Sequence, residues 1–480
     1  MKTLKQHFGT VTSSFFILLF CYAAISKIID FENFQVQLAQ SPLTNAYSVS
    51  ISYAVIAVEL LIVSLLSSSK LRLPGLHASF TLMVFFTVYI YVILNYSDNI
   101  PCSCGGVLEE LGWSEHLIFN ILCAAAALAA IMSNSETGKN ILLPLVVAET
   151  AIPALLLAVS FYPVVMQNQD VFVRKVVDPF NSEMQVIELT KSSYYIAGNF
   201  QDTVFLADSK TPLLLTTIDP AFGRLKVDTL KLDDYNLKFR SVNINVLYPY
   251  FSLTDGKVPA IFEGELPSFS ARKTDIGNLY FSKIVLMNSN QYIFRAVVTR
   301  SKQSELGVLN TLQKSHSINP KVLESQIDGI FDTDGNITFD RERKKIFYTY
   351  LYRNEIVLTD PDLNHIERFN TIDSFSGDDI KVRKLSTGQT KLVKTPQQVN
   401  TYQSVWGNDL YNISKIRGKN ESFKDFSKKI VIDIYDTNSK KYKYSYYVKN
   451  DNKSSVKGIL RTKKYFYVLS SDHITRYAFK

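Results

Sequence analysis

Long apolar stretches separated by short polar connections make up the first third of the chain. Each has roughly 17 to 25 residues, the length that a helix needs to cross a hydrocarbon core of about 30 Å. The five stretches cover residues 11–29, 47–66, 76–94, 114–132 and 141–165. The pattern predicts that residues 1–165 form a bundle of five membrane-spanning helices in contact with the lipid bilayer.

Residues 170–480 follow a different pattern, in which short runs of β-branched and aromatic residues alternate with polar turns. Such hairpins recur at 194–206, 346–358 and 465–477, with weaker copies around 288–291 and 407–409. A unit that returns every roughly 40 to 50 residues is typical of a β-propeller. We therefore predict an all-β exported domain of about six blades, with a solenoid or two β-sandwiches as the alternatives.

Composition and charge separate the same two regions. The chain is 46% hydrophobic and 20% charged, which excludes disorder. Residues 1–165 hold 6 of the 52 Lys and Arg residues and 9 of the 44 Asp and Glu residues, a net charge of −3, so the remainder has a net charge of +11. Its basic residues are interspersed with acidic ones and form no long run of one sign. Nucleic acid is therefore not an expected partner.

Basic residues in the short loops predict how the bundle is oriented. Those on one side are Lys2, Lys5, Lys70, Arg72 and Lys139, and the opposite loops carry only Lys27. We expect a multi-pass protein of a bacterial inner membrane, with a cytoplasmic N-terminus and a periplasmic C-terminal domain. In an alternative interpretation the first stretch is a cleavable signal peptide, because small residues, Ala23 and Ala24, follow its apolar run.

Two cysteines one residue apart, Cys102 and Cys104, lie between the third and fourth stretches on the side predicted to be exported. Glycines at 105 and 106 let the backbone turn sharply, so the pair can form a readily reduced disulfide or exchange with an outside thiol. A plain structural bridge and half of a metal site fit the spacing too. A metal needs further ligands, and only His116 is nearby, so no metal is expected.

Several polar or reactive residues fall at or within the apolar stretches. Glu59 and Glu149 are ionisable groups at a depth where they cost a few kcal/mol and mark either a functional site or a paired polar group. A neutral glutamic acid bonded to a hydroxyl is the structural alternative. His116 has a side chain suited to proton exchange near neutral pH. Cys21 and Cys123 are expected to be packing residues.

A set of these positions carries a family resemblance. It comprises Ser26-Lys27-Ile28-Ile29-Asp30-Phe31 with Phe34, Val58-Glu59, Cys102-Ser103-Cys104-Gly105-Gly106, and Trp113, His116 and Asn120. Through these positions, the segment 5–165 resembles the methylamine-utilisation MauE family, which belongs to the wider group of DoxX-like membrane proteins. The resemblance implies a redox-associated bundle, similar in plan to quinone-linked disulfide-forming enzymes. It leaves the electron acceptor open between a quinone and a second protein.

The resemblance also implies roles for individual residues. Cys102 and Cys104 match the family's thiol pair and Glu59 its intramembrane acid, and His116 is the candidate for proton exchange. The namesake system is tied to maturation of methylamine dehydrogenase, whereas the large β domain here departs from it and implies another exported client or thiol partner. We expect a thiol-disulfide oxidoreductase.

Two other functions stay open from the sequence. One is a non-enzymatic, membrane-anchored β-propeller that acts as a receptor or scaffold. The other is a propeller hydrolase or lyase, which needs converging Asp, His and Glu residues. The exported part offers only His316, His365 and His473 as histidines, and the sequence does not bring them together.

Overall fold

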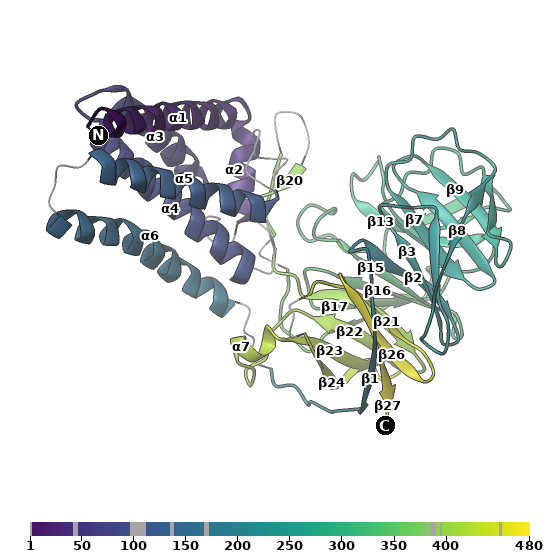
Figure 1. The fold of residues 1–480 in the computed structure, drawn as a ribbon. Coiled ribbons are helices and arrows are strands. Elements are labelled where there is room, and N and C mark those ends of the chain that lie inside the picture. The colour runs from purple at the N-terminus through teal and green to yellow at the C-terminus, as the bar shows by residue number, and fades with distance from the viewer. Residues whose placement is uncertain are drawn as a thin grey trace. The chain divides into compact units, whose positions relative to one another are not determined.

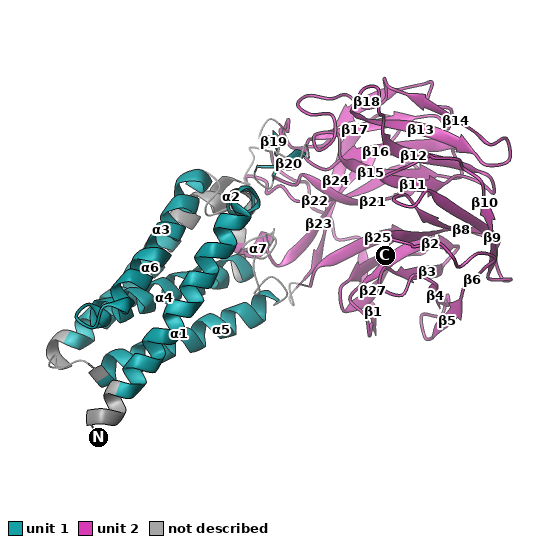
Figure 2. Cartoon of the chain, turned by 90° about the horizontal axis from the view of Figure 1, so that it is seen from above, with its two compact units in different colours: residues 1–167, 380–396 teal, residues 168–379, 397–480 magenta. Residues whose placement is uncertain are grey.

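Two compact units make up the protein in the computed structural model (Figure 2). Unit 1 comprises residues 1–167 and 380–396, and unit 2 comprises residues 168–379 and 397–480. The structure describes residues 2–41, 47–96, 112–134, 139–167, 172–377, 380–384, 390–393, 396–450 and 454–480.

Unit 1 is a helical bundle (Figure 1), and many apolar side chains are exposed on it. Its helices are α1 (Lys2–Ile29), α2 (Phe31–Gln40), α3 (Ser48–Ser67), α4 (Arg72–Tyr96), α5 (Trp113–Asn134) and α6 (Lys139–Gln167). Phe16, Phe20 and Met83 are buried between them, whereas Leu18 and Leu122 are exposed. Apolar side chains on both the inside and the outside of a bundle are expected where lipid replaces water.

Successive long helices run in opposite directions along the bundle. As a result α2, the start of α3, the end of α4, the start of α5 and the end of α6 lie at one end (Figure 1). Close packing at the other end depends on Gly75 of α4, because a Cβ there would come within 2.8 Å of the Leu66 side chain of α3.

Four helices, and not the predicted five, have the length and apolar character of membrane spans among the described residues. They are His7–Ile29, Ser48–Ser67, Arg72–Leu94 and Trp113–Ser133. The prediction of a fifth span at 141–165 is wrong by this measure, because the apolar part of α6 is the shorter stretch Leu142–Leu157. Glu149 interrupts it. An odd number of spans places the two ends of a chain on opposite sides of a membrane. With four spans, this argument no longer applies.

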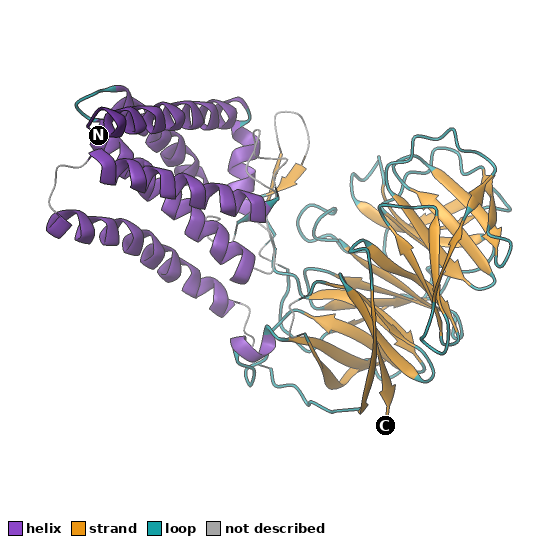
Figure 3. Ribbon diagram, in the orientation of Figure 1, coloured by secondary structure: helices purple, strands orange, loops and turns teal. Residues whose placement is uncertain are grey.

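Unit 2 is all-β and consists mainly of four-stranded antiparallel meanders (Figure 3). The first three are β2 (Tyr194–Phe200), β3 (Thr203–Asp208), β4 (Leu214–Ile218) and β5 (Leu225–Thr229); β7 (Val242–Leu247), β8 (Tyr250–Asp255), β9 (Ala260–Glu265) and β10 (Ser270–Thr274); and β11 (Lys283–Leu286), β12 (Gln291–Val297), β13 (Ser304–Asn310) and β14 (Ser315–Asn319). A short strand, β6 (Lys231–Leu232), pairs with β10.

The other three meanders complete the domain. They are β15 (Gly335–Asp340), β16 (Lys345–Tyr350), β17 (Glu355–Thr359) and β18 (Glu367–Asn370); β21 (Asn400–Trp406), β22 (Asp409–Ser414), β23 (Lys429–Asp436) and β24 (Lys441–Lys449); and β25 (Val456–Arg461), β26 (Tyr465–Ser470) and β27 (His473–Phe479) with β1 (Phe180–Glu188). One helical turn, α7 (Phe423–Phe426), interrupts the fifth meander. The hairpins predicted from the sequence are all present, because alternating strand residues and polar turns are local signals.

The meanders close into a ring. The first strand of each contacts the first strand of the next, in the order β2, β7, β11, β15, β21, β25 and back to β2. β1 pairs with β27, with Ile187 opposite Ile474, so the beginning and end of the domain share one sheet. The prediction of an all-β, propeller-like domain with about six blades is confirmed, and the solenoid and sandwich alternatives are wrong.

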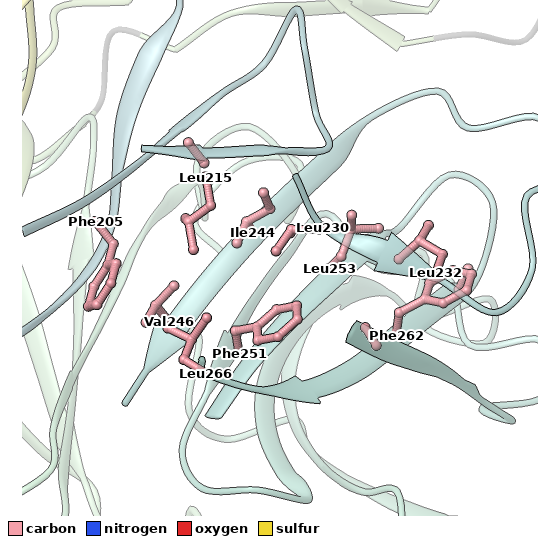
Figure 4. Packing of buried hydrophobic residues seen from close by; sticks show 13 residues of the cluster. Phe205, Leu215, Leu230, Leu232, Ile244, Val246, Phe251, Leu253, Phe262 and Leu266 are labelled. Carbon is pink, nitrogen blue, oxygen red and sulfur yellow. The ribbon is translucent and has the colours of Figure 1, made fainter. Parts of the chain in front are cut away.

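Each pair of neighbouring blades buries an apolar cluster between its two members. Figure 4 shows the cluster between the first two, with Phe205 and Leu215 of one blade facing Ile244 and Phe251 of the next. The blades approach closely where β2 pairs with β7, at Gly198 and Val246. A Cβ on Gly198 would lie 2.0 Å from the Val246 carbonyl oxygen, so only glycine fits there.

Candidate functional site

A buried ion pair joins α1 to α3 inside the bundle. Lys27 Nζ lies 2.7 Å from Glu59 Oε1, and the Glu59 side chain is only 1% exposed. The Cα–Cβ bonds of a helix tilt towards its N-terminus, so a lysine near the end of α1 directs its side chain back into the bundle. Lys27 Nζ also donates to the Ala23 carbonyl, 3.3 Å away, which fixes this direction.

The short helix α2 covers this pair at one end of the bundle. Lys27 Nζ lies 5.8 Å from the centre of the Phe34 ring, within the range of a cation–π contact. Phe34 and Leu38 of α2 are buried against Ala24 of α1 and Ile56 of α3. The ion pair is therefore shielded by apolar side chains.

Two polar residues lie on one face of α5. His116 lies within electrostatic reach of Lys27. Asn120 is one helical turn further along the same face and is 2% exposed. Within the described part of the chain, Asn120 Nδ2 and Glu59 Oε2 have no hydrogen-bond partner. We call Lys27, Glu59, His116 and Asn120 the polar site.

Within the described residues, the polar site contains an unpaired carboxylate oxygen on α3 and an unpaired amide on α5. An unpaired buried polar atom costs about 1–3 kcal/mol, and the described part of the bundle has two more, Ser41 Oγ and Arg72 Nε. The carboxylate oxygen can accept from a hydroxyl group and exchange a proton with it, and the amide can donate to a carbonyl group. His116 adds an imidazole, whose two nitrogens can donate or accept a proton.

The predicted site residues are placed unequally. Glu59 and His116 both lie near Lys27, in the polar site. Cys102 and Cys104 lie outside the described residues. The sequence did not identify Lys27 as a site residue, because it lies at the edge of an apolar stretch, where a loop residue is expected. One feature could have identified it: Lys27 is the only basic residue in the loops on its side of the predicted bundle.

The two cysteines inside the helices differ in environment. Cys123 of α5 is buried in the core of the bundle beside Met83 and Ala127. Cys21 of α1 is half-buried. Both are free thiols, and the packing interpretation fits Cys123 because its neighbours are apolar.

A second polar pair connects α4 to α6. His77 Nδ1 lies 2.9 Å from Glu149 Oε1 and 3.1 Å from Glu149 Oε2. The side chains are 15% and 14% exposed, so this pair is less buried than Glu59. The structural alternative for Glu149 was a bond to a hydroxyl. In the structure its carboxylate pairs with the imidazole of His77 instead. Nothing in the local sequence links the two residues, because they are 72 positions apart.

Unit 2 gathers no catalytic histidine cluster among its described residues. His316 packs against the Phe294 ring on the third blade, His365 lies near Asp360 on the fourth, and His473 pairs with Asp472 on the sixth. In the same described part of the chain, no group of three or more His, Cys, Asp or Glu side chains could hold a metal ion. The arrangement gives no support to a propeller hydrolase or lyase.

The buried guanidinium group of Arg174 anchors the segment that precedes the first strand of unit 2. Arg174 Nε and Nη2 donate to the two carboxylate oxygens of Asp433 at 2.8 and 3.0 Å, and Nη1 donates to Glu421 at 2.5 Å. Ser414 accepts a further bond from Nη2 at 2.9 Å. Each nitrogen of the guanidinium is satisfied, and the cluster ties residue 174 to β22 and β23.

The fold and the polar site define a multi-pass membrane protein that carries a β-propeller unit. The family model described as methylamine utilisation protein MauE matches residues 5–133. This match includes α1 to α4 and nearly all of α5, and it confirms the resemblance for that part of the chain. No curated protein matches the chain.

Solved structures of similar fold align with about two thirds of the chain. A member of the DUF4221 family from Bacteroides vulgatus is 12% identical, with a TM-score of 0.42 over 64% of this chain and 99% of that one. A protein of unknown function from Bacteroides thetaiotaomicron is 11% identical, with a TM-score of 0.40 over 65% of this chain and 76% of that one.

Proposed function

We propose that this protein is a membrane thiol-disulfide oxidoreductase that acts on an exported client through Cys102 and Cys104. The observation that carries the proposal is the polar site, in which Glu59 Oε2 and Asn120 Nδ2 are buried without partners in the described structure. The site lies within the residues matched by the MauE family model, whose name links it to methylamine utilisation. The helix that carries His116 and Asn120 begins at Trp113, soon after the cysteine pair in the sequence.

The proposed reaction has two exchange steps. A client dithiol reduces the Cys102–Cys104 disulfide and becomes a disulfide itself, through a mixed disulfide with one of the two cysteines. The reduced pair then transfers two electrons and two protons to an acceptor, a quinone that becomes a hydroquinone or the disulfide of a second protein. The polar site accepts and passes on these protons, with Glu59 and His116 as the titrating groups.

The location follows from the same proposal. We place the protein in the inner membrane of a bacterium with its N-terminus in the cytoplasm, because the basic loop residues gather on that side. Lys27, the one basic residue that argued otherwise, is paired with Glu59 and contributes little net charge. The cysteine pair and the client then lie outside the cytosol, where disulfides persist.

Trapping of a mixed disulfide tests the proposal. In a single-cysteine variant the remaining thiol attacks the disulfide of an oxidised client, releases one client thiol and stays joined to the client, because the cysteine that resolves the adduct is gone. One of Cys102→Ser and Cys104→Ser should therefore give an adduct on non-reducing electrophoresis after acid quenching. The double variant is the matched control and should give none. If neither single variant captures a partner and the double variant retains full function in cells, thiol exchange is not the activity.

A membrane-anchored receptor is the second candidate function. It is favoured by the closed ring of unit 2, in which β1 and β27 share a sheet and the apolar core lies between blades. In that case the bundle serves as an anchor, and loss of both cysteines leaves client binding unchanged. The same trapping experiment therefore separates the two functions.

A further inference from the structure

The outer strand of the first blade has an uncovered edge. β5 ends its sheet beyond β4, at the rim of the propeller (Figure 2). Two other outer strands of unit 2 are covered. β10 pairs with β6, and residues 175–177 run beside β24, where the Ser445 amide donates to the Lys175 carbonyl at 2.8 Å. An uncovered edge offers unpaired N–H and C=O groups to another chain.

The hydrogen bonds to β4 show which backbone groups of β5 are unpaired. Leu230, which follows β5 directly, donates its N–H to the Leu213 carbonyl at 2.8 Å. Bonds of this kind to one neighbour recur at every second residue of an antiparallel strand. Lys226 and Asp228 therefore bond to β4. The residues of β5 whose N–H and C=O groups point away from β4, and bond to no other strand among the described residues, are Leu225, Val227 and Thr229.

The side chains of β5 are suited to a strand partner. Successive side chains of a strand point to opposite faces. Leu225 and Val227 lie on one face and are 40% and 52% exposed. Lys226 and Asp228 lie on the other face, with Lys226 Nζ 3.0 Å from Asp228 Oδ1. A single exposed apolar residue is common, but two of them on an unpaired edge favour the addition of a further strand.

The sequence of β5 is complementary to itself. In an antiparallel pair of two copies, with Val227 opposite Val227 of the second copy, Lys226 lies opposite Asp228 of that copy, and opposite charges in this position stabilise a pair of strands. The outward backbone groups of residues 225, 227 and 229 also meet in this register, with two hydrogen bonds in each of three residue pairs. A shift of two residues in either direction places Lys226 or Asp228 opposite its own copy, where like charges repel.

We propose that β5 is the interface of a homodimer, in which two copies of this chain join their first blades through an antiparallel pair of strands centred on Val227. Such an interface uses the same surface on both copies, so it closes at two and leaves neither edge of β5 free. The edge is short, and the dimer is therefore reversible. This inference goes beyond the proposed function and uses no residue of the polar site or the cysteine pair.

Disulfide trapping tests the register. Val227→Cys meets its own copy at the two-fold axis, where the two Cα atoms are about 5.5 Å apart, a distance that a disulfide spans. The full chain in detergent, with serine at Cys102 and Cys104, should therefore give a linked dimer after oxidation with copper phenanthroline. Leu225→Cys is the matched control, because it is exposed on the same face but lies roughly 14 Å along the strand from its own copy. Equal linkage in the two variants, or none in Val227→Cys, would overturn the proposal.

A proline at the centre of the strand tests the backbone pairing. The N–H of Val227 points away from β4, so Val227→Pro leaves the bonds to β4 in place but removes two bonds from the dimer. At roughly fivefold for each bond, the dissociation constant should rise roughly thirtyfold. Val227→Thr keeps the N–H and the branched shape and should dimerise as the wild type does. Sedimentation of the full chain in detergent over a range of concentrations provides the measurement. A wild type that stays monomeric, or equal dissociation constants for the two variants, would contradict the proposal.

Exchange of the two charges tests whether the partner is a second copy. Lys226→Asp places a carboxylate opposite Asp228 of each copy and should weaken the dimer roughly tenfold. Lys226→Asp/Asp228→Lys is complementary to itself again and should restore the dimer, which a general effect of losing Lys226 would not do. A double variant as weak as the single one, or a different protein linked to Val227→Cys, would refute the homodimer. The trapping of a client through Cys102 and Cys104 uses other variants, so either proposal can fail alone.

Discussion

Two buried charged residues, one in each unit, are bonded in contrasting ways. In the propeller, Arg174 uses its three guanidinium nitrogens on Asp433, Glu421 and Ser414, and Ser445 donates a further bond to Asp433 at 2.5 Å. In the bundle, Lys27 satisfies one oxygen of Glu59, and the other has no partner in the described structure.

The contrast separates an anchor from a site. A satisfied network in a low-dielectric interior rigidifies the structure around it, whereas an under-satisfied one costs free energy that packing must supply. Within the described structure, unpaired buried side-chain atoms occur in the propeller too, among them Arg295 Nε, Asp328 Oδ2 and Arg353 Nη2. The polar site is a better candidate for function than Arg174 because an ionisable group inside an apolar bundle is costly and by default marks a functional site.

The largest effect is expected from breaking the anchor in the propeller. Arg174→Met keeps most of the side-chain volume but leaves Asp433 and Glu421 buried without their cation, which should cost about 3–5 kcal/mol of unfolding free energy. Urea unfolding of the full chain checks this by fluorescence, in a Trp113→Phe background where Trp406 is the remaining tryptophan. Lys175→Met, at the exposed neighbouring position, is the control. A shift no larger than that of the control would show that the network is not an anchor.

Breaking the ion pair of the bundle should have a comparable effect on the helices. Lys27→Met leaves Glu59 unpaired and should lower abundance in membranes several-fold, since removal of one partner of a buried pair costs about 3–5 kcal/mol. The double variant Lys27→Met/Glu59→Leu should restore abundance but leave Cys102 and Cys104 reduced in cells, because the polar site then passes no protons to the acceptor. Lys70→Met, in the exposed turn between α3 and α4, is the control. Alkylation of free thiols after acid quenching measures the state of the cysteines, and a pair as oxidised as in the wild type would make the ion pair structural only.

The third prediction concerns Asp373, a buried carboxyl group of the propeller whose hydrogen bonds do not offset the cost of burying its charge. Burial raises the pKa of Asp373 to about 6, against bonds from Thr371 Oγ1 at 2.6 Å and the Phe375 amide at 3.1 Å that favour its charged form. A raised pKa means that the folded state binds the proton more tightly, so stability should fall as the pH rises from about 4 to about 6.

Asp373→Asn should remove this dependence. Compared with the variant, the wild type should lose about 3 kcal/mol across that window, from the change between the ordinary value of 3.8 and about 6. Urea midpoints at several pH values provide the measurement. Asp362→Asn at an exposed position should follow the wild type. Parallel profiles for the wild type and Asp373→Asn would refute the assignment.

The smallest effect is expected at the second polar pair of the bundle. Glutamine keeps the shape and one acceptor oxygen of Glu149 beside His77, so Glu149→Gln should change stability by about 1 kcal/mol or less. Thermal unfolding in nanodiscs, beside Lys27→Met, makes the comparison direct. An equal loss in the two variants would mean that the charge of Glu149 contributes as much to the bundle as the buried pair of Lys27 and Glu59.

Local patterns in the sequence were sufficient for most of the secondary structure. Apolar stretches long enough to span a membrane predict helices wherever they occur, and alternating residues between polar turns predict hairpins such as β26 and β27. Both signals involve residues within one element. The overcount at residues 141–165 shows where this fails, because the apolar part of α6 is the shorter stretch Leu142–Leu157.

Only the tertiary structure decided which polar groups meet. Lys27 and Glu59 are 32 residues apart, Arg174 and Asp433 are 259 apart, and Gln35 and Arg383 are 348 apart. The residue type alone shows that each of these side chains costs free energy when it is buried. It does not show which partner offsets that free energy. Helix packing and ring closure bring the partners together, and they determine that one buried charge is fully bonded while the other keeps an oxygen free.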